Sequence, residues 1–321
     1  TTMGKKAHAA GIIAALAALA VTVLRIALMP QMQDAHTGEF KVSFVIIGIT
    51  AAAAAAVILL SYLDRSPVLP LWEGVPLKVL SCAVLLFGII QTVTALYDFF
   101  SYLQTGDAAS QPAVQSALVL DRLALIGVFL FGTLSGIFGI VAGADWLYTG
   151  RFAPGKYRYF PLFLPLWMWM RLARYVVSYA SAVSVAETFY DYAMLIVTLL
   201  FSMSLARYIA GQTNFRSPAL LWQALLTVIC GLSGTVTRFI MYLSGETEAY
   251  QASSMATLPD FCIAVVAALV ALALLLGKKP AGVTACEKEE EIASPSEAQR
   301  VLDELVPDAH TAEPDDHAAE K

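Results

Sequence analysis

The fold of this chain is decided by residues 161–211, PLFLPLWMWMRLARYVVSYASAVSVAETFYDYAMLIVTLLFSMSLARYIAG. The stretch predicts two apolar helices joined by a short turn, because Ser184 and Glu187 have the spacing of a capping box that starts a second helix. The first helix contains Arg171 and Arg174 near its middle. A charged side chain near the centre of a bilayer costs between about 3 and 15 kcal/mol. We therefore expect both arginines to face protein or water rather than lipid.

The composition is that of a membrane protein. Of the 321 residues, 58% are hydrophobic and 14% are charged, whereas about one quarter of the residues in ordinary soluble domains are charged. Several apolar runs have the roughly 20 residues needed to cross a hydrocarbon layer of about 30 Å. The first run is longer than the apolar core of a signal peptide, which has about 7 to 15 residues. We predict an all-α polytopic membrane protein, a bundle of eight transmembrane helices at residues 10–29, 42–63, 76–100, 117–148, 161–183, 185–211, 219–243 and 261–277.

The basic residues predict how these spans are threaded. Cytoplasmic segments of membrane proteins are enriched in Lys and Arg. With the amino terminus inside, the outer loops of this chain contain only Lys41 as a basic residue, and they carry acidic residues such as Asp260. We therefore predict a bacterial plasma-membrane protein with both termini in the cytoplasm. The basic residues of the inner segments are Lys5, Lys6, Arg65, Lys78, Arg151, Lys156, Arg158, Arg207, Arg216, Lys278 and Lys279.

The chain divides into a transmembrane domain, residues 1–279, and an acidic cytoplasmic tail, residues 280–321. From residue 278 onward there are 12 acidic and 5 basic residues. A segment with such high charge and low hydrophobicity is predicted to be disordered. Ser294 and Glu297 form a second capping box. It predicts a short amphipathic helix of transient helicity, because helices this short are marginal in water. A cytoplasmic protein is the partner that such a tail would bind.

Glycines in the fourth predicted helix have the spacing of a packing interface. Gly132 and Gly136 form one pair four residues apart, and Gly139 and Gly143 form another. Small residues at this spacing let helix backbones approach closely in membranes. We expect a tight crossing between this helix and a neighbour.

No catalytic or metal-binding motif occurs in the sequence. His8, His36, His310 and His317 all lie outside the predicted spans, whereas a haem or di-iron centre within the bundle needs imidazole at depth. The four cysteines lack CxxC spacing, and HExxH, GxSxG and phosphate-binding loops are missing. We expect no enzymatic activity, no cofactor and no metal site. The charge distribution gives no indication of a nucleic-acid partner.

Ionisable residues near the outer ends of several spans permit two interpretations. They are structural ion pairs that lock the bundle, since buried charges need partners, or they surround an outward-facing polar pocket with Arg171 and Arg174 at its floor. In the second case, a small anion or a lipid phosphate would accept bidentate hydrogen bonds from the arginines. The candidates for ion pairs are Arg25, Asp121, Arg122, Glu187 and Asp191. The candidates for ligand binding are Arg171, Arg174, Tyr175, Arg238, Gln91 and Asp98.

A pattern across the fifth and sixth predicted helices consists of Pro165, Trp167, Arg171, Leu172, Tyr179, Glu187, Ala206 and Arg207. This pattern resembles a family of uncharacterised multi-pass membrane proteins from anaerobic Gram-positive bacteria. The family has no assigned activity. The resemblance therefore implies a bacterial plasma membrane and no particular function.

Two hypotheses on function follow from the sequence. In the first, the protein binds or conveys a small anionic solute or a lipid headgroup through the outward-facing polar site. In the second, it is a non-catalytic signalling or scaffold subunit that acts through its acidic cytoplasmic tail, so deletion of residues 280–321 would abolish partner binding. Proton- or sodium-coupled transporters usually have a carboxylate at the membrane centre. No acidic residue is predicted at that depth, which argues against coupled transport.

Overall fold

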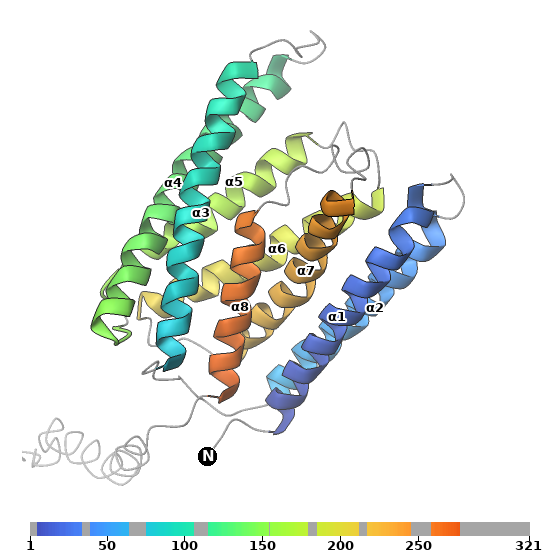
Figure 1. The fold of residues 1–321 in the computed structure, drawn as a ribbon, viewed down its shortest axis with the longest axis horizontal. Helices are drawn as coiled ribbons and strands as arrows, with labels where there is room; N and C mark the ends of the chain where they lie inside the picture. Colours follow the sequence, from blue (N-terminus) through green and yellow to red (C-terminus); the bar gives the residue numbers. More distant parts are fainter. Residues whose placement is uncertain are drawn as a thin grey trace, which may run out of the picture. The chain divides into compact units, whose positions relative to one another are not determined.

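The computed structural model describes residues 5–33, 39–63, 75–105, 115–153, 155–178, 185–211, 217–244 and 258–276. Within these ranges the chain is helical and forms no strand, which confirms the all-α prediction. Figure 1 shows the helices, which are α1 (Lys5–Gln33), α2 (Glu39–Leu63), α3 (Val75–Thr105), α4 (Gln115–Thr149), the short 3-10 helix η2 (Phe160–Leu162), α5 (Phe163–Ser178), α6 (Val185–Ile209), α7 (Ser217–Ser244) and α8 (Leu258–Leu276).

Seven of these helices are long and apolar enough to cross a membrane. The prediction of a polytopic membrane protein is confirmed at this level. The exception is α5, whose 16 residues have a length of about 24 Å, less than the roughly 30 Å of a hydrocarbon core. Residues 179–184, which the predicted fifth span includes in part, lie outside the described residues. An eighth crossing at this place therefore stays a prediction.

Most helices begin a few residues earlier than predicted, and in α1 and α8 the shift changes where a polar residue lies. Helix α1 starts at Lys5, so His8 lies inside a candidate span, and the expectation that every histidine lies outside the spans is wrong. Lysine is a good helix former, so the basic residues at the start extend the helix. The sequence predicted that Asp260 lies in an outer loop, and this is wrong. Helix α8 starts at Leu258, so Asp260 belongs to its first turn. Proline and acidic residues both favour the first turn of a helix.

Helix α7 is the central helix of residues 5–276. It packs against α1, α2, α6 and α8 (Figure 1). In its apolar window, 78% of the residues are buried, against 17% for α2 at the periphery. Its buried hydroxyl groups are satisfied within the helix, since each donates a hydrogen bond to a carbonyl oxygen one turn earlier. These residues are Thr227, Ser233, Thr235 and Thr237.

Helices α3 and α4 form the tight crossing that the glycine spacing predicted. A Cβ atom added at Gly143 would lie 2.7 Å from the backbone nitrogen of Leu85, and one added at Gly136 would lie 2.9 Å from the carbonyl oxygen of Gly88. The two backbones are therefore in contact, and Gly88 is the opposing residue on α3. Gly132 differs, because its nearest neighbours are the side chains of Gln91 and Trp167.

The connection between α4 and α5 is hydrogen-bonded to the last turn of α6. Gly150 and Gly155 adopt positive φ angles of 63° and 86°, a conformation that glycine adopts without steric cost. The Gly155 N–H donates to the carbonyl oxygen of Ile209, 2.8 Å away, at the end of α6. Lys156 donates to Asp145 over 2.7 Å, and this hydrogen bond raises the pKa of the Lys156 ammonium.

The acidic tail and its predicted short helix, residues 280–321, lie outside the described residues. The division into a membrane domain and a disordered tail stays a prediction. So does the hypothesis that the tail binds a cytoplasmic partner.

The α3–α4 crossing makes the first prediction. In Gly88→Ala, the new methyl group would lie 2.5 Å from the Ile140 nitrogen and 2.6 Å from the Gly136 carbonyl oxygen, so the backbones must separate. Overpacking of this kind costs about 1–3 kcal/mol. Thermal unfolding in detergent, followed by tryptophan fluorescence, should show a lower melting temperature.

The matched control is Gly48→Ala on α2. No atom lies within 4 Å of a Cβ at this position, and alanine is the better helix former by about 0.5–1 kcal/mol. Its melting temperature should be unchanged or slightly higher. Equal melting temperatures for the two variants would contradict the tight crossing.

Candidate binding site

Helices α3 and α5 end, and α4, α6 and α8 begin, at the same end of the bundle (Figure 1). Several charged residues of the chain belong to the helix segments near this end. Consecutive helices alternate in direction, so residues far apart in sequence arrive at the same level. The residues concerned come from seven helices and are Arg25, Asp98, Asp121, Arg171, Arg174, Asp191, Arg238 and Asp260.

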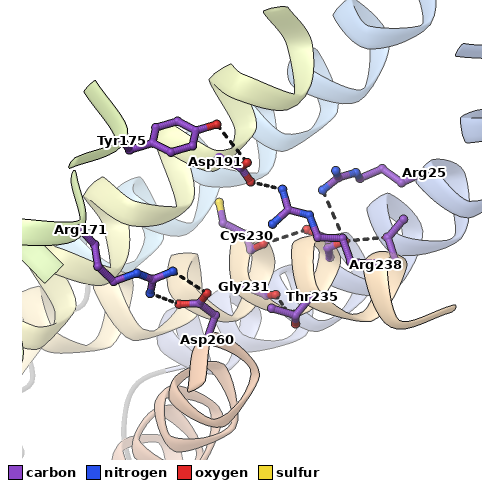
Figure 2. Close-up of polar contacts among 11 residues, drawn as sticks. Arg25, Arg171, Tyr175, Asp191, Cys230, Gly231, Thr235, Arg238 and Asp260 are labelled. Atoms are coloured by element: carbon purple, nitrogen blue, oxygen red, sulfur yellow. Dashed lines mark hydrogen bonds and ion pairs between the residues drawn. The ribbon is translucent and has the colours of Figure 1, made fainter. Parts of the chain in front are cut away.

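Arg171 of α5 forms a buried bidentate ion pair with Asp260 of α8 (Figure 2). Nη2 donates to Oδ2 over 2.9 Å, and Nη1 donates to Oδ1. The two side chains are 6% and 4% exposed. The guanidinium group also lies over the ring of Trp167, 4.8 Å from its centroid. The deeper of the two predicted arginines is thus neutralised by a carboxylate that the sequence had placed in a loop.

A second buried ion pair joins Asp191 of α6 to Arg238 of α7. Both side chains are buried, and the Tyr175 hydroxyl of α5 donates to Asp191 Oδ2 over 3.1 Å (Figure 2). Tyr175 and Arg238 were both predicted as ligand-binding residues. The structure places them in this pair, which connects three helices, and not in the wall of the charged cavity described below.

Arg25 of α1 is buried against two residues of other helices. Its guanidinium carbon lies 4.1 Å from the centroid of the Tyr190 ring, and Nη1 donates to the carbonyl oxygen of Ser233 over 3.4 Å. The hydroxyl groups of Tyr190 and Ser233 also form a hydrogen bond with each other. A cation over an aromatic face contributes about 0.5–2 kcal/mol. Arg25 therefore ties α1 to α6 and α7.

A cavity of about 260 Å³ lies between α3, α4, α5 and α8. Four of the six predicted ligand-binding residues line it: Gln91, Asp98, Arg171 and Arg174. Asp98 is exposed and the side chain of Arg174 is 26% exposed, whereas Gln91 is only 1% exposed. The cavity therefore opens at the end of the bundle and narrows towards Gln91. We call it the charged cavity.

Two lining residues retain hydrogen-bonding capacity. Among the described residues, Asp121 is the one hydrogen-bond partner of Arg174, and the bond from Nε to Oδ1 is long, at 3.4 Å. Both Nη groups of Arg174 are therefore open to another acceptor. In the same part of the chain, the buried Oε1 atom of Gln91 has no hydrogen-bond partner. An unsatisfied buried polar group of this kind costs about 1–3 kcal/mol.

The charges around the cavity do not favour a simple anion. Two cations, Arg171 and Arg174, are balanced by Asp260 and Asp121, which leaves the carboxylate of Asp98 in excess. An anion at Arg174 would be repelled by Asp98 unless it brought a positive charge of its own.

The remaining predicted residues are less informative. Arg122 is exposed on α4 and does not line the charged cavity. Glu187 lies on α6, and its side chain is outside the described residues. Asp260 was missed as a site residue although the sequence held a signal for it. The order Leu-Pro-Asp at 258–260 has a proline and an acid where the first turn of a helix favours them.

Comparisons with models of known protein families, with curated proteins and with solved protein structures give no match.

The Arg171–Asp260 pair makes the second prediction. Asp260→Asn leaves a guanidinium group buried without its carboxylate, and removing one partner of a buried pair costs about 3–5 kcal/mol. Asp121→Asn removes the partner of a partly exposed arginine, and such pairs contribute about 0–1 kcal/mol. Thermal unfolding in detergent should show a large loss of stability in the first variant and a small one in the second.

A double variant separates charge from packing. Arg171→Met with Asp260→Leu removes both charges, so it should regain most of the stability that Asp260→Asn loses. Similar melting temperatures for Asp260→Asn and Asp121→Asn would show that the buried pair is not the stronger constraint.

Proposed function

We propose that this protein is a multi-pass plasma-membrane protein that binds a small charged group in the charged cavity, that of a solute or a lipid headgroup. The single observation that carries the proposal is the cavity of about 260 Å³, whose wall includes Arg174, Asp98 and Gln91. The distribution of basic residues supports an orientation with both termini in the cytoplasm. In that orientation the cavity opens to the outside.

The anionic part of the ligand binds at Arg174. Charge-assisted hydrogen bonds between arginine and carboxylate are usually about 2.7–2.9 Å long, so the 3.4 Å bond to Asp121 is weak. A phosphate or carboxylate can accept hydrogen bonds from the Nη groups without breaking a strong contact. Arg171 contributes its charge rather than hydrogen bonds, because both of its Nη groups bind Asp260.

The cationic part of the ligand binds at Asp98. This carboxylate is an acceptor with a negative charge, and Asp98 belongs to the wall of the charged cavity. An ammonium group is a donor with a positive charge, so it suits Asp98 and offsets the excess negative charge. A group that combines a phosphate with an ammonium, such as phosphoethanolamine, satisfies Arg174 and Asp98 together.

Arg174→Gln makes the third prediction. A hydrogen bond to a charged group contributes about 1.5–3 kcal/mol, so the affinity for phosphoethanolamine should fall roughly 10- to 100-fold. Isothermal titration calorimetry on protein in phosphatidylcholine nanodiscs measures it. The matched control, Arg122→Gln, removes the same charge at the same end of the bundle but outside the cavity wall. An unchanged affinity in Arg174→Gln would overturn the proposal.

Asp98→Asn makes the fourth prediction, in which the affinities for two ligands change in opposite directions. Without the carboxylate, phosphoethanolamine should bind several-fold more weakly, because its ammonium loses its counter-charge. Inorganic phosphate should bind more tightly, because a repulsive charge has been removed. The same titrations with the two ligands measure both effects. If both affinities rise, the site binds simple anions and Asp98 has no role in holding a cation.

A further inference from the structure

A second cavity lies between α3, α4, η2, α5, α6 and α8, and its wall is mainly apolar. It encloses about 60 Å³, and we call it the apolar cavity. Its wall contains two serine hydroxyls, and both are already satisfied: Ser135 donates to the Gly132 carbonyl over 2.9 Å, and Ser202 donates to the Leu199 carbonyl over 2.8 Å. Neither hydroxyl group needs a ligand as acceptor. A cavity with such a wall suits an alkyl chain.

The two cavities follow each other along the same helices. On three of the helices that line the charged cavity, a residue of the apolar cavity lies one turn away, at a rise of about 4.5–6 Å. The pairs, with the charged cavity first, are Gln91 and Phe87 on α3, Trp167 and Leu164 on α5, and Pro259 and Ile263 on α8.

Two side chains of the charged cavity meet α4 at a glycine. A Cβ atom at Gly132 would lie 3.1 Å from both the Gln91 amide nitrogen and the Trp167 ring. Both side chains are buried, and Trp167 packs against the Arg171 guanidinium group. A chain bound in the charged cavity reaches the apolar one where these side chains change rotamer.

The length of this arrangement fits one lipid molecule. Asp98 in the charged cavity and Phe87 in the apolar cavity are both on α3, and the 11 positions from one to the other correspond to about 16 Å of helix. A bilayer with its headgroups is about 40–45 Å thick, so a single lipid is about 20 Å long. Both cavities can be reached by one such molecule.

We infer that the ligand is an amphiphile, whose headgroup carries a phosphate and an ammonium and occupies the charged cavity, and whose alkyl chain reaches the apolar cavity. The inference rests on the proposed function, since the bound headgroup is what positions the chain. It adds that the ligand comes from the membrane and is not a free solute.

The test compares two probes that share a headgroup, phosphoethanolamine and single-chain lysophosphatidylethanolamine. Native mass spectrometry of the full chain, titrated with each probe, gives both dissociation constants. Each buried methylene group adds about 0.8 kcal/mol, so two groups in the apolar cavity should make the lysolipid bind at least about tenfold more tightly than phosphoethanolamine.

Val84→Phe makes the fifth prediction, which tests whether the alkyl chain of the ligand occupies the apolar cavity. Val84 lines the apolar cavity, so the larger ring should fill it and weaken lysolipid binding about tenfold, while phosphoethanolamine binding stays unchanged. The matched control is Val93→Phe, the same substitution at a position of α3 that is 61% exposed. It should change neither affinity. If Val84→Phe fails to fold, Val266→Phe on α8 fills the same cavity, with the exposed Leu272→Phe as its control.

The outcomes separate the two proposals. If phosphoethanolamine binds but the lysolipid binds no more tightly, or if Val84→Phe leaves the lysolipid affinity unchanged or weakens both probes equally, the amphiphile inference is overturned and the proposed headgroup site remains. If neither probe binds to the wild-type protein, the proposed function itself fails, and the inference fails with it.

Discussion

The need to neutralise a buried guanidinium group is the constraint on which the rest of this structure depends. Arg171 lies on a helix of 16 residues, and its side chain is almost fully buried. An unpaired charge buried in this way would destabilise the fold by about 3–5 kcal/mol. Asp260 satisfies both Nη groups, and Trp167 covers the face of the guanidinium. The pair links α5, which packs mainly against α4 and α6, to α8.

The two interpretations of the charged residues turn out to be compatible. Pairs that are fully buried, such as Asp191 with Arg238, connect helices. The pair between Arg174 and Asp121 is longer and about a quarter exposed, and it lies at the wall of a cavity. All of these residues belong to the same end of the bundle. The two pairs therefore differ in how deeply they are buried and in the length of their contacts. Structural pairing thus supplies the rigid frame on which a binding site can be held.

The charge balance of the cavity refines the kind of ligand that fits it. With Arg171 and Arg174 each matched to an aspartate, Asp98 is in excess. A preference for simple anions would have followed from the arginines alone. We propose that the aspartates shift the preference towards a group with charges of both signs, and that the apolar cavity one turn away accommodates an alkyl chain of the same ligand.

The sequence alone determined the helical membrane class, most helix boundaries to within a few residues, and the glycine crossing of α4, because these depend on local hydrophobicity and spacing. It also predicted four residues of the charged cavity, since charge at depth is rare and informative. It did not predict the partner of Arg171, because Asp260 is 89 residues away along the chain. Which carboxylate meets which guanidinium, and whether Tyr175 and Arg238 face a cavity or a buried pair, depends on how helices pack. That packing was decided only by the tertiary structure, because membrane helices associate through side-chain contacts that span the whole chain.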